Sequence, residues 1–269
     1  MHEFVSFNHQ IIPAKSALLS AVSSAAFYGK GIFTTLAIYD KKPFLWEKHW
    51  HRLTADAKKI GVDLAEFSEE TVIKSLSAII EKNNLVHARA RLTFFDESLN
   101  SVWQTESKRQ TSLLIVAADL RSTSENLRLT VSPFRVNASS PLAGVKSCNY
   151  LENILALENA KANGFDEAIR LNENGEITSA CLANVFWIKG EKLFTPNLET
   201  GCLAGTTRAF VLENFAVEKR KTNLAELNKA DEIFLTSTGI GIAKVKSLDG
   251  KVFGDNIMGE LQRGPIISL

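Results

Sequence analysis

The first 120 residues combine the two-residue alternation of strands with the three-and-four spacing of amphipathic helices. Alternating or β-rich runs predict strands at residues 5–13, 31–46, 87–96 and 111–120, and the first two of these fold back as hairpins. Helical spacing predicts helices at residues 47–61 and 68–84, the second of which is capped by Ser68.

The remaining residues show the same mixture. Strands are predicted at residues 127–136, 166–196 and 231–250, and the middle segment is a meander that turns at Asn-Gly and Lys-Gly pairs. Helices are predicted at residues 150–164, with a strongly amphipathic pattern, and at residues 205–216. Because strands and helices mix without strict alternation, we expect an α/β or α+β fold with two lobes.

The polar segment 121–126 lies between two strand-like runs and is the best candidate for an interdomain linker. It divides the chain into a small N-terminal domain, residues 1–120, and a larger C-terminal domain, residues 127–269.

Composition narrows the class of protein. The 269 residues are 45% apolar and 23% charged, as in a globular protein, and a net charge of +1 gives no reason to expect nucleic acid as a partner. Three cysteines without C-x-x-C spacing fit reduced cytoplasmic thiols. We find no signal-peptide pattern and no apolar run of roughly 20 residues that could span a membrane, so we expect a cytoplasmic protein.

Two stretches have the composition of an anion cradle. Residues 203–208 place glycine and two threonines at a helix start, and residues 235–241 end a strand in hydroxyls and glycines. Each stretch alone also reads as a helix cap or a tight turn. Neither matches a P-loop, and no G-x-G-x-x-G follows a strand.

Candidate reactive groups also have ordinary interpretations. Lys146 is the charged residue of the loop PLAGVKSCN, and it is either a surface lysine or a desolvated lysine that can form a Schiff base. His49 and His51 point to different faces of a helix, so no metal site is expected. Arg52 shares a face with His49 and could bind an anion or cap a helix.

Eight landmarks occur in order between about residue 25 and residue 250. They are the segments 28–35, 49–53, 141–150, 165–168, 184–186, 195–196, 205–208 and 235–238. Together they resemble the fold-type IV pyridoxal-phosphate enzymes, also called class IV aminotransferases. This family contains branched-chain aminotransferases, D-amino-acid aminotransferases and 4-amino-4-deoxychorismate lyase.

The resemblance implies roles for particular residues. Lys146 matches the catalytic lysine that forms a Schiff base with pyridoxal 5′-phosphate and then moves protons. The residues that match cofactor-binding positions are Arg52, Tyr150, Ser179, Asn184, Thr206, Thr207 and Thr238. The substrate-binding candidates are Tyr28, Thr35, Arg89, Arg91 and Arg109, of which the arginines could equally be solvent-facing strand residues.

The family also implies an overall organisation. It predicts a small N-terminal α/β domain and a larger C-terminal pseudo-barrel domain, with the cofactor between them. It further implies a small-molecule amino substrate and a homodimer.

Two residues depart from the family pattern. Lys30 stands where the family usually has aspartate. Ser179 stands where the family has a glutamate that pairs with the protonated pyridine nitrogen of the cofactor. A serine can only hydrogen-bond to this nitrogen, which we expect to be neutral, so the cofactor would be a weaker electron sink.

These features favour aminodeoxychorismate lyase, which converts 4-amino-4-deoxychorismate to 4-aminobenzoate and pyruvate in folate biosynthesis. The chain is short, Phe33-Thr34-Thr35 resembles some lyases, and aromatisation of the product offsets a weak electron sink. Tyr150 instead favours a branched-chain or D-amino-acid aminotransferase. A third hypothesis, motivated by Lys30 and Ser179, is a cofactor-binding homologue with weak activity.

Overall fold

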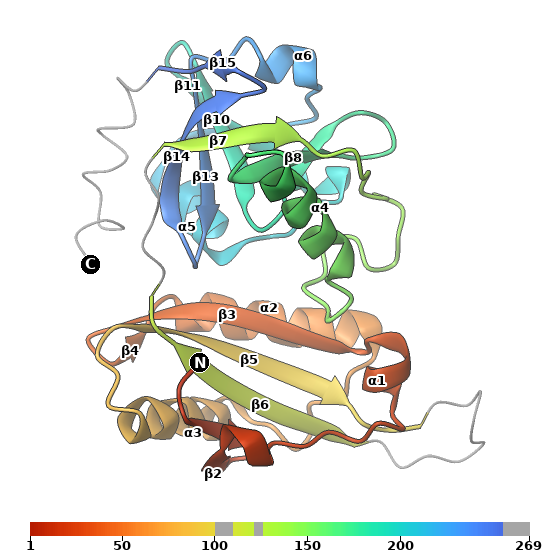
Figure 1. Cartoon of the computed structure of the whole chain (residues 1–269), viewed down its shortest axis with the longest axis vertical. Coiled ribbons are helices and arrows are strands. Elements are labelled where there is room, and N and C mark those ends of the chain that lie inside the picture. Colours follow the sequence, from red (N-terminus) through yellow and green to blue (C-terminus); the bar gives the residue numbers. More distant parts are fainter. Residues whose placement is uncertain (100–109, 121–125, 255–269) are drawn as a thin grey trace. The chain divides into compact units, whose positions relative to one another are not determined.

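The structure is a computed structural model that describes residues 1–99, 110–120 and 126–254 (Figure 1). It divides into two compact units, Met1–Arg121 with Val145–Asn149, and Ser122–Gly144 with Tyr150–Leu269. Residues 145–149 group with the first unit, because Ser147 pairs with Ile32 of one of its strands. Residues 121–125 of the predicted linker lie outside the described ranges, so the linker stays a prediction.

Within the described residues, the first unit is built on a six-stranded antiparallel sheet with the order β2-β1-β6-β5-β3-β4. Its strands are β1 (Phe4–Phe7), β2 (Gln10–Pro13), β3 (Gly31–Tyr39), β4 (Lys42–Pro43), β5 (Ala88–Asp96) and β6 (Thr111–Ala118). Its helices are η1 (Ala14–Ser16), α1 (Ser24–Tyr28), α2 (Trp46–Ile60) and α3 (Glu69–Lys82). The short helix α1 was not predicted from the sequence.

One face of this sheet forms the core of the first unit. Alternate residues of β5, from Ala88 to Phe94, are buried with Leu53 of α2 and Leu76 of α3. Because side chains alternate across a strand, the other face carries Phe33, Thr35 and Arg91. The predicted amphipathic helices therefore cover one face and leave the other for polar chemistry.

Residues 145–149 lie along the start of β3. Ser147 forms an antiparallel bridge with Ile32, and the Cys148 amide donates to the Gly31 carbonyl at 2.8 Å. A side chain at Gly31 would lie 2.7 Å from the Phe94 carbonyl oxygen and 3.0 Å from Cys148 Sγ, so glycine is needed for this close approach. The pairing fixes the backbone of Lys146 against the sheet.

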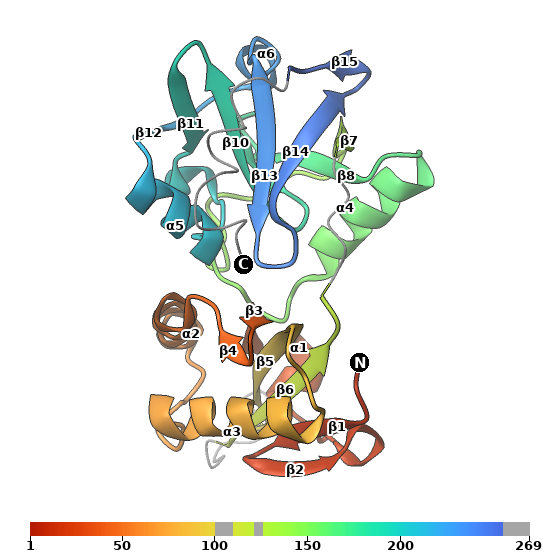
Figure 2. The same cartoon turned by 90° about the vertical axis from the view of Figure 1, so that its left-hand side faces the viewer.

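The second unit holds a nine-stranded mixed sheet in its described part, with the order β12-β11-β10-β13-β14-β7-β8-β9 and β15 paired to β14. Figure 2 shows β10, β13 and β14 side by side. The strands are β7 (Leu127–Val131), β8 (Glu167–Leu171), β9 (Ile177–Ala180), β10 (Asn184–Lys189), β11 (Lys192–Pro196), β12 (Val217–Arg220), β13 (Glu232–Ser237), β14 (Gly241–Leu248) and β15 (Lys251–Val252). The sheet curls, because β9 also packs near β10 and β11.

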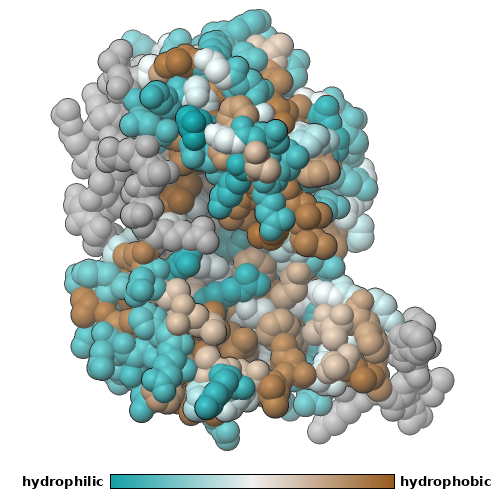
Figure 3. Space-filling view, viewed as in Figure 1, coloured by the Kyte–Doolittle hydropathy of each residue, from teal (hydrophilic) through white to brown (hydrophobic). Residues whose placement is uncertain are grey.

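The helices of the second unit are α4 (Leu151–Ala162), η2 (Leu198–Thr200), α5 (Thr206–Asn214) and α6 (Leu224–Leu227). Helix α4 forms where it was predicted, but its amphipathic pattern is misleading. Its buried face consists of Ala156 and Ala160, while Leu151, Ile154 and Leu155 are exposed. Figure 3 shows hydrophobic residues on the surface over this part of the second unit. Small alanines let the helix approach the sheet closely, which sequence periodicity does not reveal.

Strand β7 is shorter than predicted. It ends at Val131 instead of residue 136, because Pro133 lacks an amide hydrogen and interrupts the ladder. The Ser132 hydroxyl accepts from the Phe134 amide at 3.2 Å and supports the turn that follows. Among the described helices, none is both long enough and apolar enough to cross a membrane.

Candidate functional site

Lys146 lies in the first unit and its backbone is held on two sides. Its amide donates to Asp56 Oδ2 at 3.1 Å, and its carbonyl accepts from the Phe33 amide at 2.9 Å. The ammonium nitrogen lies 4.5 Å from the centroid of the Phe33 ring. Strand β3 and helix α2 together therefore position the side chain that the sequence singled out.

The surroundings of Lys146 lower its pKa to about 7. Desolvation is the largest cause, the positive charges of Arg52 and Arg91 add to it, and the Asp56 carboxylate opposes it. About half of the amine is then neutral near neutral pH, whereas an ordinary lysine is almost entirely protonated. A neutral amine is the form that can attack a carbonyl carbon or accept a proton.

Arg91 is the substrate-binding candidate that the structure brings to Lys146. Its guanidinium carbon lies 3.6 Å from the centroid of the same Phe33 ring, and its Nε donates to Thr93 Oγ1 at 3.2 Å. Thr35 is the direct cross-strand neighbour of Arg91. A cation in this position suits a substrate carboxylate.

The other substrate-binding candidates lie elsewhere in the first unit or cannot be placed. Arg89 is two residues earlier on β5, opposite Ala37. Tyr28 ends helix α1 and is 43% exposed. Arg109 falls outside the described residues.

Arg52 is positioned by a buried chain of hydrogen bonds. Its Nη2 donates to Thr34 Oγ1 at 2.9 Å, and Thr34 Oγ1 lies 2.6 Å from His49 Nδ1. Burial lowers the pKa of His49 well below its usual value, and the charges of Arg52 and Lys146 lower it further. Since Thr34 accepts from Arg52, its own proton is available for Nδ1 of the neutral imidazole.

Sequence reasoning missed the roles of Thr34, His49 and Asp56 in this group. His49 and Asp56 lie three residues before and four residues after Arg52, which places all three on one side of α2. Burial raises the pKa of Asp56, while the Lys146 amide and nearby cations oppose the rise. The helical spacing of His49, Arg52 and Asp56 is visible in the sequence, but the burial that shifts the pKa values of His49 and Asp56 is not.

The second unit contains a narrow cradle at the start of α5. Asn184 Nδ2 donates to the Leu203 carbonyl at 2.8 Å, and a side chain at Gly205 would lie 2.0 Å from Asn184 Oδ1. Gly205 caps α5 without a side-chain hydrogen bond. Thr206 Oγ1 lies 3.5 Å from Thr238 Oγ1 in the turn between β13 and β14.

This cradle fits the phosphate of a cofactor. Four of the predicted cofactor-binding residues meet at the start of α5, namely Asn184, Thr206, Thr207 and Thr238. Thr207 follows Thr206 in the helix and is also buried. Amide hydrogens and the positive end of the helix dipole favour an anion there. Glycine leaves the space that a side chain would fill.

The two remaining cofactor candidates lie on other elements of the second unit. Tyr150 is the N-cap residue of α4, directly before Leu151, and it is partly buried. Ser179 lies on β9, directly opposite Arg170 of β8, and is partly buried between buried neighbours. Sequence reasoning did not single out Arg170, since an isolated arginine in a strand normally faces solvent.

Comparison with known proteins places the chain among relatives of both predicted kinds. The amino-transferase class IV family matches residues 31–248. The aminodeoxychorismate lyase of Bacillus subtilis (strain 168) is 26% identical over 256 residues, covering 92% of this chain and 87% of that protein. The branched-chain-amino-acid aminotransferase-like protein 2 of Arabidopsis thaliana is 29% identical over 266 residues, covering 94% of this chain. This chain spans about half of that plant protein, 47% of its length.

The fold agrees with this assignment. The crystal structure of the Escherichia coli branched-chain amino acid aminotransferase matches with a TM-score of 0.89 and 25% identity, covering 97% of this chain and 92% of that one. The predicted two-domain fold-type IV architecture is thereby confirmed. The matched residues 31–248 include Lys146, Arg52 and the cradle at α5. The chain belongs to the class IV aminotransferase family of enzymes, as the resemblance in its sequence implied.

Proposed function

We propose that this chain is a pyridoxal-phosphate-dependent lyase that converts 4-amino-4-deoxychorismate to 4-aminobenzoate and pyruvate. The single observation that carries the proposal is the desolvated Lys146 amine, whose pKa is lowered to about 7 beside Arg52 and Arg91. Family membership implies the cofactor, and the cradle at Gly205 fits its phosphate.

The cofactor and the residues around it have separate roles in the proposed reaction. When bound, the cofactor withdraws electrons and acidifies the hydrogen on the amino-bearing carbon of the substrate. The cradle residues of the second unit, Thr206, Thr207, Thr238 and Asn184, would hold the phosphate by hydrogen bonds, and the family pattern assigns Arg52 to the same group. Tyr150 would hydrogen-bond to the 3′-oxygen of the cofactor, and Ser179 would hydrogen-bond to the ring nitrogen.

Lys146 acts as nucleophile and as base. Its neutral amine would anchor the cofactor by condensing with its aldehyde, with loss of water. With the substrate in place, the Lys146 amine would be the base that takes the proton from the amino-bearing carbon. Asp56 and Phe33 hold the backbone of Lys146 from both sides and so limit the positions that Nζ can reach.

The preference for a lyase rests on Ser179 and Arg91. A serine at the ring nitrogen weakens electron withdrawal, and formation of an aromatic product supplies the driving force that transamination lacks. Arg91 offers a cation beside Lys146 for a carboxylate of the substrate.

The deciding experiment is a paired assay on the cofactor-loaded protein. We expect pyruvate and 4-aminobenzoate to form in equal amounts from 4-amino-4-deoxychorismate, and both to be lost in Lys146→Ala. In parallel, branched-chain and D-amino acids are supplied with 2-oxoglutarate. Amino transfer without pyruvate release would overturn the lyase assignment.

An aminotransferase is the second candidate, which Tyr150 and the Arabidopsis relative's name favour. The third is a homologue that binds the cofactor with weak activity. The ion pair between Lys30 and Asp96, at 2.7 Å, gives Lys30 a structural role and removes it as an argument for this third candidate.

We further propose that the protein is a cytoplasmic homodimer that acts in folate biosynthesis on a small amino substrate, with no nucleic-acid or membrane partner. The exposed Leu151, Ile154 and Leu155 of α4 support a contact between protein copies. Light scattering during size-exclusion chromatography should give twice the chain mass. A single-chain mass across the working concentration range would exclude the dimer.

A further inference from the structure

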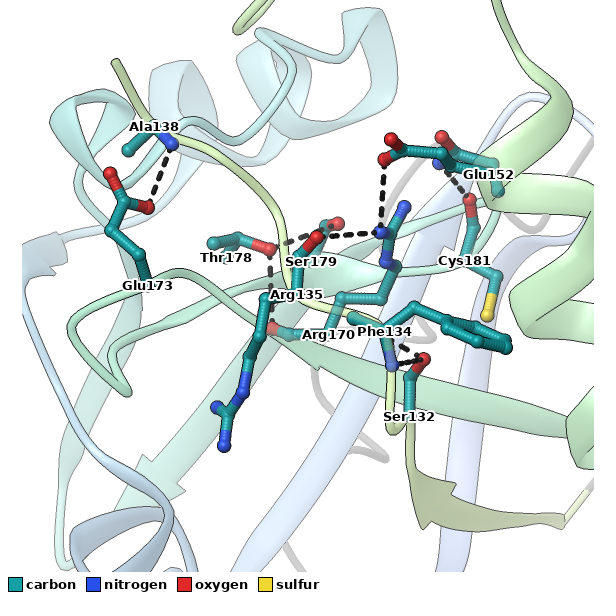
Figure 4. Close-up of polar contacts among 11 residues, drawn as sticks. Ser132, Phe134, Arg135, Ala138, Glu152, Arg170, Glu173, Thr178, Ser179 and Cys181 are labelled. Atoms are coloured by element: carbon teal, nitrogen blue, oxygen red, sulfur yellow. Dashed lines mark hydrogen bonds and ion pairs between the residues drawn. The ribbon is translucent and has the colours of Figure 1, made fainter. Parts of the chain in front are cut away.

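A buried cation lies directly beside Ser179 in the second unit. Arg170 of β8 is among the largest fully buried side chains of the molecule, at 2% exposure. It is the cross-strand partner of Ser179, so both side chains leave the β8–β9 pair on the same face. Figure 4 shows the Arg170 side chain running past Ser179 toward Glu152.

The contacts of Arg170 are too few for a buried guanidinium. Its Nη2 donates to the Arg135 carbonyl at a long 3.4 Å and lies 3.5 Å from Glu152 Oε2. The Glu152 side chain is 76% exposed, so water screens its charge. Nε of Arg170 is buried and meets no acceptor among the described residues. This buried guanidinium therefore has two long contacts and one N–H without an acceptor among the described residues, so its positive charge is only partly compensated at this face.

Two further carboxylates of the described residues, Glu167 and Glu173, do not take the place of the family's glutamate. Glu167 lies on the same strand, but alternation puts it on the opposite face from Arg170. Its carboxyl accepts from the amides of Ala168, Cys181 and Leu182 at 3.0, 2.8 and 3.3 Å. Burial raises the pKa of this carboxyl, and the three amides oppose the rise. Glu173 is engaged by the Ala138 amide at 2.9 Å, and the Arg135 side chain is exposed.

The Ser179 hydroxyl lies on the same face of the β8–β9 pair as the Arg170 side chain. Thr178 Oγ1 donates to the Arg170 carbonyl at 3.1 Å and lies 3.4 Å from Ser179 Oγ. Because Thr178 gives its single proton to the Arg170 carbonyl, the long contact between the two hydroxyls can form only with Ser179 as the donor. The Ser179 hydroxyl can turn this proton toward a better-placed acceptor. A group that binds here meets a hydroxyl donor backed by a positive charge, which suits a neutral acceptor atom and repels a protonated one.

We propose that Arg170 is the positioning residue that keeps the cofactor's ring nitrogen unprotonated, so that this nitrogen accepts from Ser179. Where the family's glutamate would supply a negative charge, Arg170 on the adjacent strand supplies a positive one. This inference rests on the proposed binding of pyridoxal phosphate. It also predicts that the Ser179→Glu variant alone cannot restore the family pattern, because Arg170 would pair with the new carboxylate.

The direct test needs no variant. Cofactor labelled with ¹⁵N at the ring position is bound to the wild-type protein, and its chemical shift is followed by NMR between about pH 6 and 9. The shift should be that of an unprotonated pyridine throughout. A protonated ring nitrogen at neutral pH overturns the inference. If the labelled cofactor does not bind at all, the proposed function fails instead.

Variants then test the role of Arg170. Arg170→Met removes the charge at similar volume, and the pH at which the ring nitrogen protonates should rise by about one unit or more. Arg170→Lys keeps a cation and should stay close to wild type. Arg135→Met, which removes an exposed arginine nearby, is the matched control and should change nothing. The double variant Arg170→Met with Ser179→Glu should hold a protonated ring. An unchanged ring titration in Arg170→Met overturns the inference.

A binding measurement covers the case in which the Arg170→Met protein folds poorly. Pyridoxal phosphate methylated at the ring nitrogen carries a permanent positive charge. In folded protein, judged by circular dichroism, the wild type should prefer the unmethylated cofactor over this analogue. The ratio of the two affinities should fall about tenfold in Arg170→Met but not in Arg170→Lys or Arg135→Met. An equal ratio in all four proteins contradicts the proposed role of Arg170.

Discussion

At the scale of single residues, the chemistry depends on where charges are desolvated. Lys146 and His49 have lowered pKa values because burial removes water and because Arg52 lies close to both. The Thr34 hydroxyl contacts both Arg52 and His49, so the neutral His49 ring holds the hydroxyl and the hydroxyl orients the Arg52 guanidinium. Two residue-scale predictions follow from these contacts.

The first prediction concerns the stability of the cofactor-free protein. Lys146 has a pKa of about 7 in the folded chain and 10.5 ordinarily, so the unfolded chain binds more protons between these values. The free energy of unfolding should therefore rise with pH across this window by a few kcal/mol relative to Lys146→Met, at about 1.4 kcal/mol per unit of pKa. Below about pH 7 the difference should be constant.

Urea unfolding of both proteins at several pH values measures this difference. Exposed Lys74→Met is the matched control, because its ammonium is at the surface beside Glu70. Parallel curves for wild type and Lys146→Met would contradict the lowered pKa.

The second prediction concerns Thr34. Thr34→Val keeps the shape but removes the hydroxyl, which leaves His49 Nδ1 buried without this partner. We expect a loss of about 1–3 kcal/mol in unfolding free energy and weaker cofactor binding, since Arg52 is no longer oriented. Thr34→Ser keeps the hydroxyl and should stay near wild type. Equilibrium dialysis and urea unfolding measure the two effects; if Val and Ser behave alike, the hydroxyl does not position Arg52.

At the scale of elements, close backbone approach decides where the candidate groups lie. Residues 146–148 reach β3 because Gly31 has no side chain, and the start of α5 reaches Asn184 because Gly205 has none. Each glycine therefore connects a loop to the strand that carries a functional group.

A third prediction follows for Gly205. In Gly205→Ala the new methyl carbon would lie 2.0 Å from Asn184 Oδ1, so Asn184 and α5 must separate. Overpacking of this kind costs about 1–3 kcal/mol in unfolding free energy. We also expect cofactor affinity to fall about tenfold or more, because the displaced α5 carries the phosphate-binding amides.

The control for this prediction is Gly239→Ala, where the nearest atom would be Ser237 Oγ at 3.9 Å. Its stability should stay within about 1 kcal/mol of wild type. Calorimetry and fluorescence titration with pyridoxal phosphate report the two quantities. If both variants have the same stability and cofactor affinity, the space around Gly205 does accommodate a methyl group.

At the scale of the whole molecule, each unit has a hydrophobic core of its own. Leu76 of α3 belongs to the core of the first unit, and Leu235 of β13 belongs to the core of the second. Both leucines are fully buried, so each should be important mainly to its own sheet.

The fourth prediction compares Leu76→Ala with Leu235→Ala. Each should lose about 2–5 kcal/mol of stability in its own unit, from lost burial and the cavity left behind. Hydrogen exchange should accelerate in β5 and β6 for the first variant and in β10, β13 and β14 for the second. Acceleration spread evenly over both units in either variant would mean that the chain unfolds as a single cooperative body.

Most of the elements, the family and the fold class are readable from the order of residues along the chain. Periodicity identified α2, α3, β5 and β6 because these elements bury one regular face, and the landmarks around Lys146 and Thr206 identified the family. By contrast, the pattern predicts a β7 that runs past Pro133, although the strand ends at Val131 and the proline is visible in the sequence.

Which residues share an environment becomes visible in the folded chain alone. Sequence spacing could not show that Arg170 lies opposite Ser179, that Thr34 joins Arg52 to His49, or that residues 145–149 join the first unit. The buried alanine face of α4 escaped the hydrophobic pattern for the same reason. Burial and charge proximity arise from strand pairing between distant segments, and these two quantities set the protonation states on which the proposed chemistry depends.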